Sequence, residues 1–279
     1  MPPVHSVPPP SPTPRIGVFD SGVGGLSLLR ALHRRLPGAS LHYVADSAWA
    51  PYGERSEAEI RERSLRIAAH LLTAGAAMLV VACNTATAAA VEALRTHWPQ
   101  IPVVGIEPGL KPALAAAGTG PVGVMATSTT LRSERFRNLL AREAGGRSVH
   151  LQACTGLADA IERLDPGDAA LAALIERHCA PLREAGVAAV ALGCTHYPLV
   201  GAQIRQAMGS GVQVIDTSDA VAEQVLRRLG ALPSPLPSPM TAAGDVLLET
   251  TGDPARLQTV ASRWLDFAFV VRQAPAALG

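Results

Sequence analysis

The hydrophobic positions of this chain fall into short apolar runs that alternate with longer helical patterns. The clearest run, residues 78–87, reads MLVVACNTAT and precedes an alanine-rich segment of helix-forming composition. An apolar run before a longer helical pattern is typical of a buried parallel strand that feeds a helix. The pattern recurs at residues 187–197, VAAVALGCTHY, where Pro198 suits the first turn of a helix. We therefore predict an α/β fold with open parallel sheets.

Each of these two runs ends in a cysteine. Cys83 and Cys194 would lie at the carboxyl ends of strands, where open α/β sheets place their ligands. The N-terminus of the next helix favours a thiolate, and Asn84 or Thr85 is expected to cap that helix. A lone cysteine is most often a small buried hydrophobe, but two cysteines in matching contexts indicate a site.

Other strands and helices are predicted from the same patterns. The strand segments lie near 15–20, 41–46, 101–106, 122–127, 212–216, 245–250 and 267–271. Helices are expected over 56–72, 133–143, 168–185 and 218–230, the first of them opened by a capping box of Ser56 and Glu59. His178 and Cys179 fall on the third of these helices, where we expect packing and no metal site.

The second half of the chain resembles the first. VGVMAT mirrors IGVFDS at an offset of 106 residues, and Cys83 and Cys194 are 111 residues apart. We expect two similar α/β domains with a pseudo-twofold relation and the active site in the cleft between them. The first domain would comprise 15–107 plus 218–279 and the second 108–217, after a disordered proline-rich tail at 1–14.

Three glycines follow the first predicted strand. Gly22, Gly24 and Gly25 resemble a dinucleotide-binding loop only loosely, because Ser27 occupies the third fingerprint position. We expect them to allow a tight strand-to-helix turn that leaves Asp20 and Ser21 facing the cleft.

The length and composition of the chain indicate a globular protein. The chain has 279 residues, 48% hydrophobic and 17% charged, which suits a globular protein of two domains. Its net charge of +1 gives no general attraction to nucleic acid or membrane, and no run of about 18 apolar residues could span a bilayer. Residues 1–14 do not read as a secretory signal, and the four cysteines show no CxxC pairing, so we expect reduced thiols in the cytoplasm.

Two thiols that face each other could carry out one of three reactions: acyl transfer, disulfide redox chemistry or proton transfer at a carbon atom. Acyl transfer needs only one nucleophile, and redox cysteines usually lie close together in sequence. Removal of a proton from one face of a carbon and delivery to the other face uses one thiolate and one thiol. We prefer this last reading because it explains the duplication, with Asp20 and His196 as tuning groups.

Seven segments in order resemble the bacterial glutamate racemase family. They are IGVFDSGVGGLS, VADSAWAPYGERS, VVACNTATAAA, VVGIEPGLKPA, VGVMATSTTLRS and LGCTHYPL, with a weaker TTGDP at 250–254. The resemblance implies an isomerase that converts L-glutamate to D-glutamate for peptidoglycan and cell-wall synthesis, by a two-base mechanism without cofactor or metal. Only Lys111 occurs in the segments considered, so no pyridoxal site is expected.

The resemblance also implies catalytic and substrate-binding roles for individual residues. Cys83 would be the base for D-glutamate, assisted by Asp20, and Cys194 the base for L-glutamate, assisted by His196 and Glu162. Substrate-binding positions would be Asp20, Ser21, Tyr52, Gly53, Asn84, Thr85, Thr195 and His196. Asp46 is similar to a family acid near the first cysteine. One departure is CTGLADAIE at 154–162, where the family has CPxxxPLxE, although Glu162 keeps its spacing.

Two other functions remain open at this stage. An aspartate or other amino-acid racemase of the same superfamily would differ in its pocket by about one methylene, worth roughly 1–3 kcal/mol. Some family members are reported to bind DNA gyrase, and such a role here would be a protein–protein contact because the sequence has no basic stripe. The resemblance further implies a homodimer and a small-molecule substrate, while the charge and hydropathy described above lead us to expect neither nucleic acid nor membrane as a partner.

Overall fold

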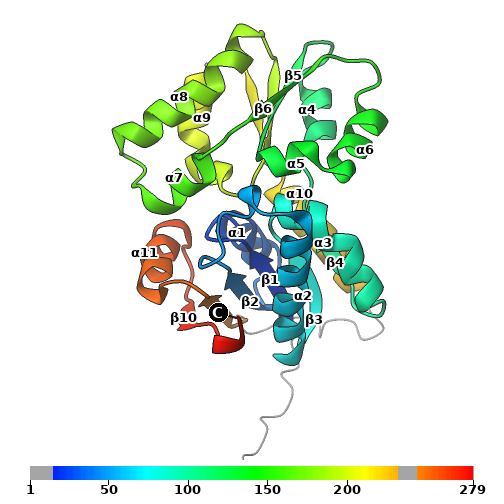
Figure 1. The fold of residues 1–279 in the computed structure, drawn as a ribbon, viewed down its shortest axis with the longest axis vertical. Helices are drawn as coiled ribbons and strands as arrows, with labels where there is room; N and C mark the ends of the chain where they lie inside the picture. Colours follow the sequence, from blue (N-terminus) through cyan, green and yellow to red (C-terminus); the bar gives the residue numbers. More distant parts are fainter. Residues whose placement is uncertain (1–14, 232–243, 279) are drawn as a thin grey trace, which may run out of the picture.

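The computed structural model describes residues 15–231 and 244–278 and contains two parallel sheets in separate lobes (Figure 1). The lower sheet contains, in spatial order, β10 (Val270–Gln273), β9 (Val246–Thr250), β2 (Ser40–Ala45), β1 (Arg15–Asp20), β3 (Ala76–Val81) and β4 (Val103–Gly105). The upper sheet contains β6 (Val149–Ala153), β5 (Val122–Ala126), β7 (Ala189–Gly193) and β8 (Gln213–Ile215). The predicted α/β class with parallel sheets is confirmed. The predicted tail at 1–14 lies outside the described residues.

The two sheets share one topology. The order β2-β1-β3-β4 in the lower sheet corresponds to β6-β5-β7-β8 in the upper sheet, and every strand pair is parallel. Strands β9 and β10 return from the C-terminal part of the chain to extend the lower sheet. This allocation of strands supports the proposed domain division, whose boundaries stay a prediction.

Helices cover both sheets. The lower lobe has α1 (Leu26–Arg35), α2 (Glu57–Thr73), α3 (Asn84–His97), α10 (Ser218–Gly230), α11 (Pro254–Trp264) and the short 3-10 helices η1 (Tyr52–Glu54) and η3 (Ala276–Leu278). The upper lobe has α4 (Leu110–Ala116), α5 (Ser128–Arg132), α6 (Glu134–Glu143), α7 (Leu157–Arg163), α8 (Ala169–Glu184), α9 (Gly201–Met208) and η2 (Tyr197–Val200). The capping box at Ser56 is present as predicted.

Alternating strand residues build two cores around the lower sheet. Ile16 and Val18 of β1 pack in the cluster that contains α1 and α10, whereas Phe19 packs in the cluster that contains α2 and α3. Successive side chains on a strand point to opposite faces, so a strand buried on both sides reads as a continuous apolar run. This burial explains why β1, β2 and β3 were predictable from sequence.

Other elements were not predicted correctly. Strand β6 was not anticipated, because it lies at a sheet edge and its sequence VHLQA is only half-buried. The last strand begins at Val270, three residues after the predicted start. Helices α4 and α5 have seven and five residues and gave too little periodicity to be recognised. The helix expected from Pro198 is present as η2 followed by α9.

Asp46 is the centre of a buried polar cluster below the cleft. Its carboxylate accepts hydrogen bonds from the Tyr52 hydroxyl at 2.6 Å, from Arg63 at 2.6 and 2.7 Å, and from the Thr251 hydroxyl at 2.8 Å. Arg63 also donates to the carbonyl oxygen of Leu278. These bonds join the loop after β2 to α2 and to the C-terminal segment, so Asp46 anchors the wall of the cleft.

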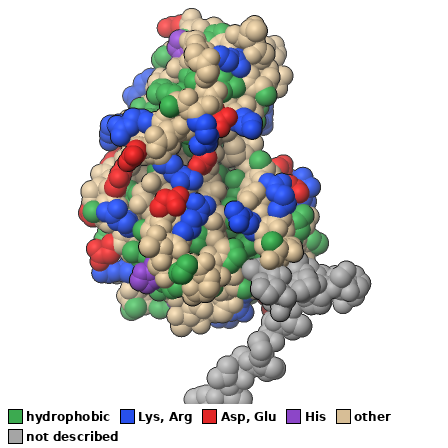
Figure 2. All heavy atoms as spheres, turned by 90° about the vertical axis from the view of Figure 1, so that its right-hand side faces the viewer, with side chains coloured by type: hydrophobic (Ala, Val, Ile, Leu, Met, Phe, Trp, Pro, Cys, Tyr) green, Lys and Arg blue, Asp and Glu red, His purple; other side chains and the backbone are tan. Residues whose placement is uncertain are grey.

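The surface gives no sign of a nucleic-acid groove on the side drawn in Figure 2. Basic and acidic side chains lie interspersed there, without a continuous basic stripe. Across residues 15–231 and 244–278, no helix combines the length and apolar character needed to cross a membrane.

Substitution of Arg63 by methionine should destabilise the protein far more than substitution of Arg66. Loss of Arg63 leaves the fully buried Asp46 carboxylate without its cation, which costs about 3–5 kcal/mol for a buried pair. Arg66 forms an exposed pair with Glu62, worth about 1 kcal/mol or less. Urea unfolding of both variants checks this, and equal costs would contradict the anchoring role of Asp46.

Candidate active site

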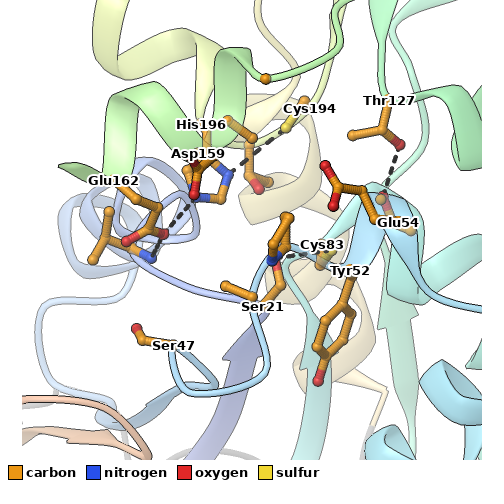
Figure 3. Close-up of a pocket in the computed structure, with 18 of the residues that line it drawn as sticks. Ser21, Ser47, Tyr52, Glu54, Cys83, Thr127, Asp159, Glu162, Cys194 and His196 are labelled. Carbon is orange, nitrogen blue, oxygen red and sulfur yellow. Dashed lines mark hydrogen bonds and ion pairs between the residues drawn. The ribbon is translucent and has the colours of Figure 1, made fainter. Parts of the chain in front are cut away.

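A cavity of about 280 Å³ lies between the two lobes, at the carboxyl ends of both sheets (Figure 3). The residues that follow the ends of six strands line it: Ser21 after β1, Ser47 after β2, Cys83 after β3, Thr127 after β5, Cys154 after β6 and Cys194 after β7. Open α/β sheets bind ligands at this edge. The structure therefore brings the two predicted cysteines to one cavity, one from each lobe.

Cys83 is held by the start of α3 and by Ser21. Its backbone is extended, and its sulfur accepts a hydrogen bond from the Ala86 N–H at 3.4 Å, so Cys83 itself is the N-cap. The prediction that Asn84 or Thr85 caps this helix was wrong, because the helix already includes both residues. The Cys83 thiol donates to the Ser21 hydroxyl at 3.7 Å.

The charge state of Cys83 also differs from the expectation. Burial raises the pKa of the Cys83 thiol, and the negative charge of Asp20 raises it further. The hydrogen bond from the Ala86 N–H lowers that pKa but does not compensate. The helix N-terminus therefore does not make Cys83 a thiolate, because burial and Asp20 favour the protonated thiol.

Asp20 lies behind the wall of the cavity. It is fully buried and accepts hydrogen bonds from the Ser21 N–H at 2.7 Å, the Thr195 hydroxyl at 3.2 Å and the Gly25 N–H. Burial raises the pKa of its carboxyl group. The Ser21 hydroxyl donates to Asp20 at 3.3 Å, so Asp20 reaches Cys83 through Ser21.

Cys194 has a different partner. Its sulfur lies 3.7 Å from His196 Nδ1, and His196 Nε2 lies 2.7 Å from Glu162 Oε1. The same Glu162 oxygen accepts the Val23 N–H of the other lobe at 2.7 Å. These contacts fix the imidazole ring beside the sulfur, and they place Glu162 in the site despite the changed loop that precedes it.

The His196–Glu162 pair favours its ionic form. Burial lowers the pKa of His196, but hydrogen bonds to Cys194 and Glu162 outweigh it and raise that pKa well above its usual value. Burial raises the pKa of Glu162, but the hydrogen bond to His196, the charge of His196 and the Val23 N–H together outweigh burial and lower that pKa. The His196 imidazolium therefore lies next to the Cys194 sulfur. On the other side, Cys83 is linked through Ser21 to the Asp20 carboxyl group.

The glycines after β1 lie in a short strand-to-helix turn and also leave space for side chains of the other lobe. A Cβ atom at Gly22 would lie 1.9 Å from Glu162 Oε1, and one at Gly24 would lie 2.4 Å from His196 Nδ1 and 2.7 Å from its backbone nitrogen. Neither glycine has a positive φ. The predicted strand-to-helix turn is present between β1 and α1, and the glycines in addition leave room for the Glu162 and His196 side chains of the other lobe.

Several predicted binding positions lie on the cavity wall. The Asn84 amide is buried with both polar atoms lacking a hydrogen-bond partner among the described residues, so it is available to a ligand. Thr85 Oγ1 lies 3.0 Å from the Thr127 hydroxyl of the other lobe. Gly53 and Thr195 also line the cavity. Tyr52 lines it too, but its hydroxyl points to Asp46 and away from both sulfurs (Figure 3).

The sequence did not indicate every residue of the wall. The additional polar residues are Ser47, Glu54, Thr127, Ser128, Thr155, Asp159, Arg163, Asp253 and Arg256. Thr127 had a signal, because it follows VGVMA as Ser21 follows the matching first strand. Arg256 had none, since it comes from α11, whose position against the cleft depends on the fold. Cys154 also lines the cavity, whereas Cys179 is buried in α8.

Comparison with known proteins agrees with this geometry. A family model described as Asp/Glu/Hydantoin racemase matches residues 16–225. The chain belongs to this family. It is 52% identical over 214 residues to a glutamate racemase from Pseudomonas paraeruginosa, covering 77% of this chain and 81% of that protein. It is 46% identical over 245 residues to one from Herpetosiphon aurantiacus, covering 88% and 95%.

The solved structures that resemble this protein include glutamate racemases. The structure is similar to a glutamate racemase isoform from Bacillus anthracis, with a TM-score of 0.84 and 31% identity over 96% of this chain and 99% of that one. It is similar to Escherichia coli glutamate racemase in complex with L-glutamate and the activator UDP-MurNAc-Ala, with a TM-score of 0.82 and 30% identity over 94% and 97%.

Substitution of Gly24 by alanine should reduce activity strongly. The added methyl group would collide with the His196 ring and backbone, and a displacement of about 1 Å in such a site costs on the order of 100-fold in rate. The matched control is Gly211→Ala, where a Cβ meets nothing within 4 Å. Steady-state kinetics of both variants check this, and an active Gly24→Ala protein would contradict the close approach of the lobes.

The His196–Glu162 pair should stabilise the protein in a defined pH window. The lowered pKa of Glu162 gives stability that is present above its ordinary value of 4.5 and lost as the pH falls through the folded value. The raised pKa of His196 gives stability that is full below 6.5 and lost as the pH rises through the folded value. The gain should therefore be largest between pH 4.5 and 6.5.

Thermal unfolding of the wild type and of a Glu162→Gln/His196→Gln double variant across pH measures this gain. We expect the difference between their midpoints to shrink on both sides of the window. A difference that stays constant with pH would show that the pair is not ionic in the folded protein.

Proposed function

We propose that the chain interconverts L- and D-glutamate by a two-base mechanism, with Cys83 and Cys194 as the acid–base pair. The observation that carries this proposal is the convergence of two separate networks on one cavity. Asp20 and Ser21 serve one sulfur, while Glu162 and His196 serve the other. The glutamate racemases among the relatives and solved structures, one of them bound to L-glutamate, support this substrate.

In the L-to-D direction, the Cys194 thiolate removes the α-proton and the Cys83 thiol delivers a proton to the opposite face. One C–H bond breaks and one forms, so the substrate has no net change in protons. The His196 imidazolium stabilises the negative charge on Cys194, and the raised pKa of Cys83 keeps a proton ready for delivery. The reverse reaction begins with the protonation states exchanged.

Hydrogen-bond donors around the cavity would hold the amino acid. The free amide of Asn84 lies on the wall of the cavity that both sulfurs line, as do Thr85, Thr127 and Ser21. Arg256 lines the same cavity and supplies positive charge for a dicarboxylate. The ratio of kcat/KM values for glutamate and aspartate measures the preference between these two substrates.

A role in peptidoglycan synthesis accords with the product, since D-glutamate is the enantiomer that the resemblance assigns to cell-wall precursors. Cytoplasmic location, assembly as a homodimer, gyrase binding and independence from a cofactor in catalysis stay predictions. Each rests on the family resemblance and on composition alone.

Conversion of L-glutamate in deuterium oxide tests the assignment. Cys194 removes hydrogen and Cys83 delivers a solvent-derived deuteron, so the first D-product should carry deuterium at Cα while the remaining L-glutamate keeps hydrogen. Cys83→Ala and Cys194→Ala should each lower kcat/KM by about 10²–10⁴-fold. The loss must be equal in both directions, because the two enantiomers have the same free energy.

Cys179→Ala provides the matched control, since this cysteine is buried in α8 and does not line the cavity. It should retain activity near that of the wild type. Early deuteration of unreacted L-glutamate, or a Cys83→Ala protein that still racemises well, would overturn the two-base assignment.

A further inference from the structure

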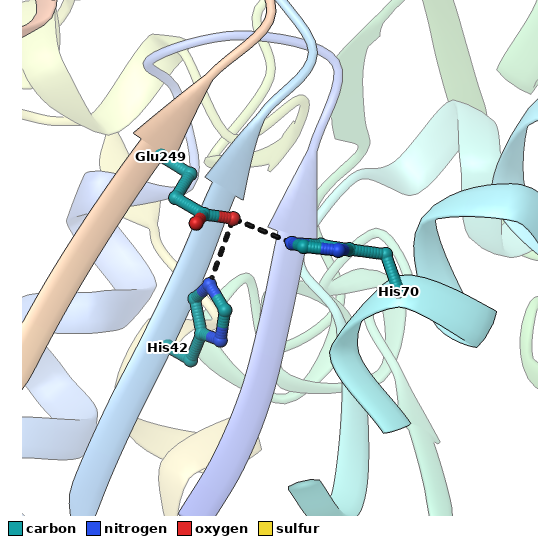
Figure 4. A group of neighbouring side chains, drawn as sticks. All are labelled: His42, His70 and Glu249. Carbon is teal, nitrogen blue, oxygen red and sulfur yellow. Dashed lines mark hydrogen bonds and ion pairs between the residues drawn. The ribbon is translucent and has the colours of Figure 1, made fainter. Parts of the chain in front are cut away.

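A second group of reactive side chains lies in the lower lobe, apart from the cavity between the sulfurs (Figure 4). His42 comes from β2, His70 from α2 and Glu249 from β9. His70 Nε2 lies 2.6 Å from Glu249 Oε2, and His42 Nε2 lies 2.9 Å from the same oxygen. None of the three lines the proposed active site. Their separation in sequence gave no pattern that could have indicated a site.

These contacts leave both ring nitrogens of His42 without a hydrogen bond to any described residue. Its side chain is only 3% exposed, yet neither ring nitrogen has a hydrogen bond of acceptable geometry to any described residue. The Glu249 oxygen is near Nε2 but does not lie in line for a hydrogen bond. A buried ring nitrogen without a partner is unfavourable, so its lone pair is available to a further ligand.

The arrangement suits a metal ion. One ligand atom from each of the three residues lies within 4.8 Å of the other two. Zinc binds imidazole nitrogen and carboxylate oxygen at about 2.0–2.2 Å, which places neighbouring ligand atoms about 3.3 Å apart in a tetrahedron. Small side-chain shifts would convert the present distances into this geometry. The donors are two imidazoles and one carboxylate, a set that favours zinc and related transition metals over magnesium or calcium.

We propose that His42, His70 and Glu249 form a divalent transition-metal site, with zinc as the preferred ion. The fourth position would be open to water, since three ligands converge among residues 15–231 and 244–278. Entry is from the side of His70, whose side chain is 20% exposed, whereas those of Glu249 and His42 are 10% and 3% exposed.

The bound ion would be a structural clamp. It would join α2 to the central strand β2 and to β9, which belongs to the C-terminal return of the chain. Thr251, two residues after Glu249, donates to Asp46 below the cleft. The metal would therefore hold the strand that supports one wall of the active site, without taking part in the reaction.

Cobalt and zinc titration of the full chain, after treatment with chelator, tests this proposal. Cobalt should bind with one ion per chain and give ligand-field bands without the near-ultraviolet charge-transfer band of a cobalt–thiolate bond. That spectrum separates the histidine site from the two active-site cysteines. Zinc at about one hundred times its Kd should raise the unfolding midpoint by about 5 °C, because it binds only the folded chain.

Two substitutions make the test specific. His70→Gln removes the most exposed ligand and should lower metal affinity at least tenfold while leaving the chain folded, as circular dichroism checks. His97→Gln, an exposed histidine at the end of α3, should bind metal like the wild type. Equal affinity in the wild type and His70→Gln, or a cobalt spectrum dominated by thiolate, would overturn the proposal and leave a hydrogen-bonded cluster only.

Discussion

The close contact between the glycine loop after β1 and the Glu162–His196 pair is the constraint on which the site depends. Glu162 accepts the Val23 N–H of one lobe and holds the imidazole of the other, and only glycine at positions 22 and 24 leaves room for both side chains. The contact closes the cavity from the side of Cys194. It also couples the position of His196 to the packing of the two lobes.

The two sulfurs occupy similar places in duplicated sheets but different electrostatic surroundings. Cys83 is buried near Asp20, which disfavours its thiolate, whereas Cys194 lies beside an imidazole whose pKa is raised. This difference gives the site a built-in preference, with a protonated thiol at Cys83 and a cation beside the sulfur of Cys194. A symmetric pair of thiols would have no such preference, so divergence of the two halves is part of the proposed mechanism.

Much of the fold was predictable because buried parallel strands leave continuous apolar runs and polar residues at their carboxyl ends. The runs before Cys83 and Cys194 therefore indicated both the sheets and the cavity. Strand β6 was not predictable, because an edge strand is only half-buried. The reason for the glycines and the contribution of Arg256 depend on how distant segments meet, which periodicity does not encode. The His42 cluster was hidden for the same reason.

The central claim is that the two sulfurs act on opposite faces of one carbon. A crystal structure of the protein with glutamate bound tests it most directly. We expect the α-carbon between Cys83 and Cys194, with both Sγ atoms about 3–3.5 Å from it and on opposite sides of the plane of its other three substituents. Binding with both sulfurs on one face, or with one sulfur beyond reach of the α-carbon, would contradict the account.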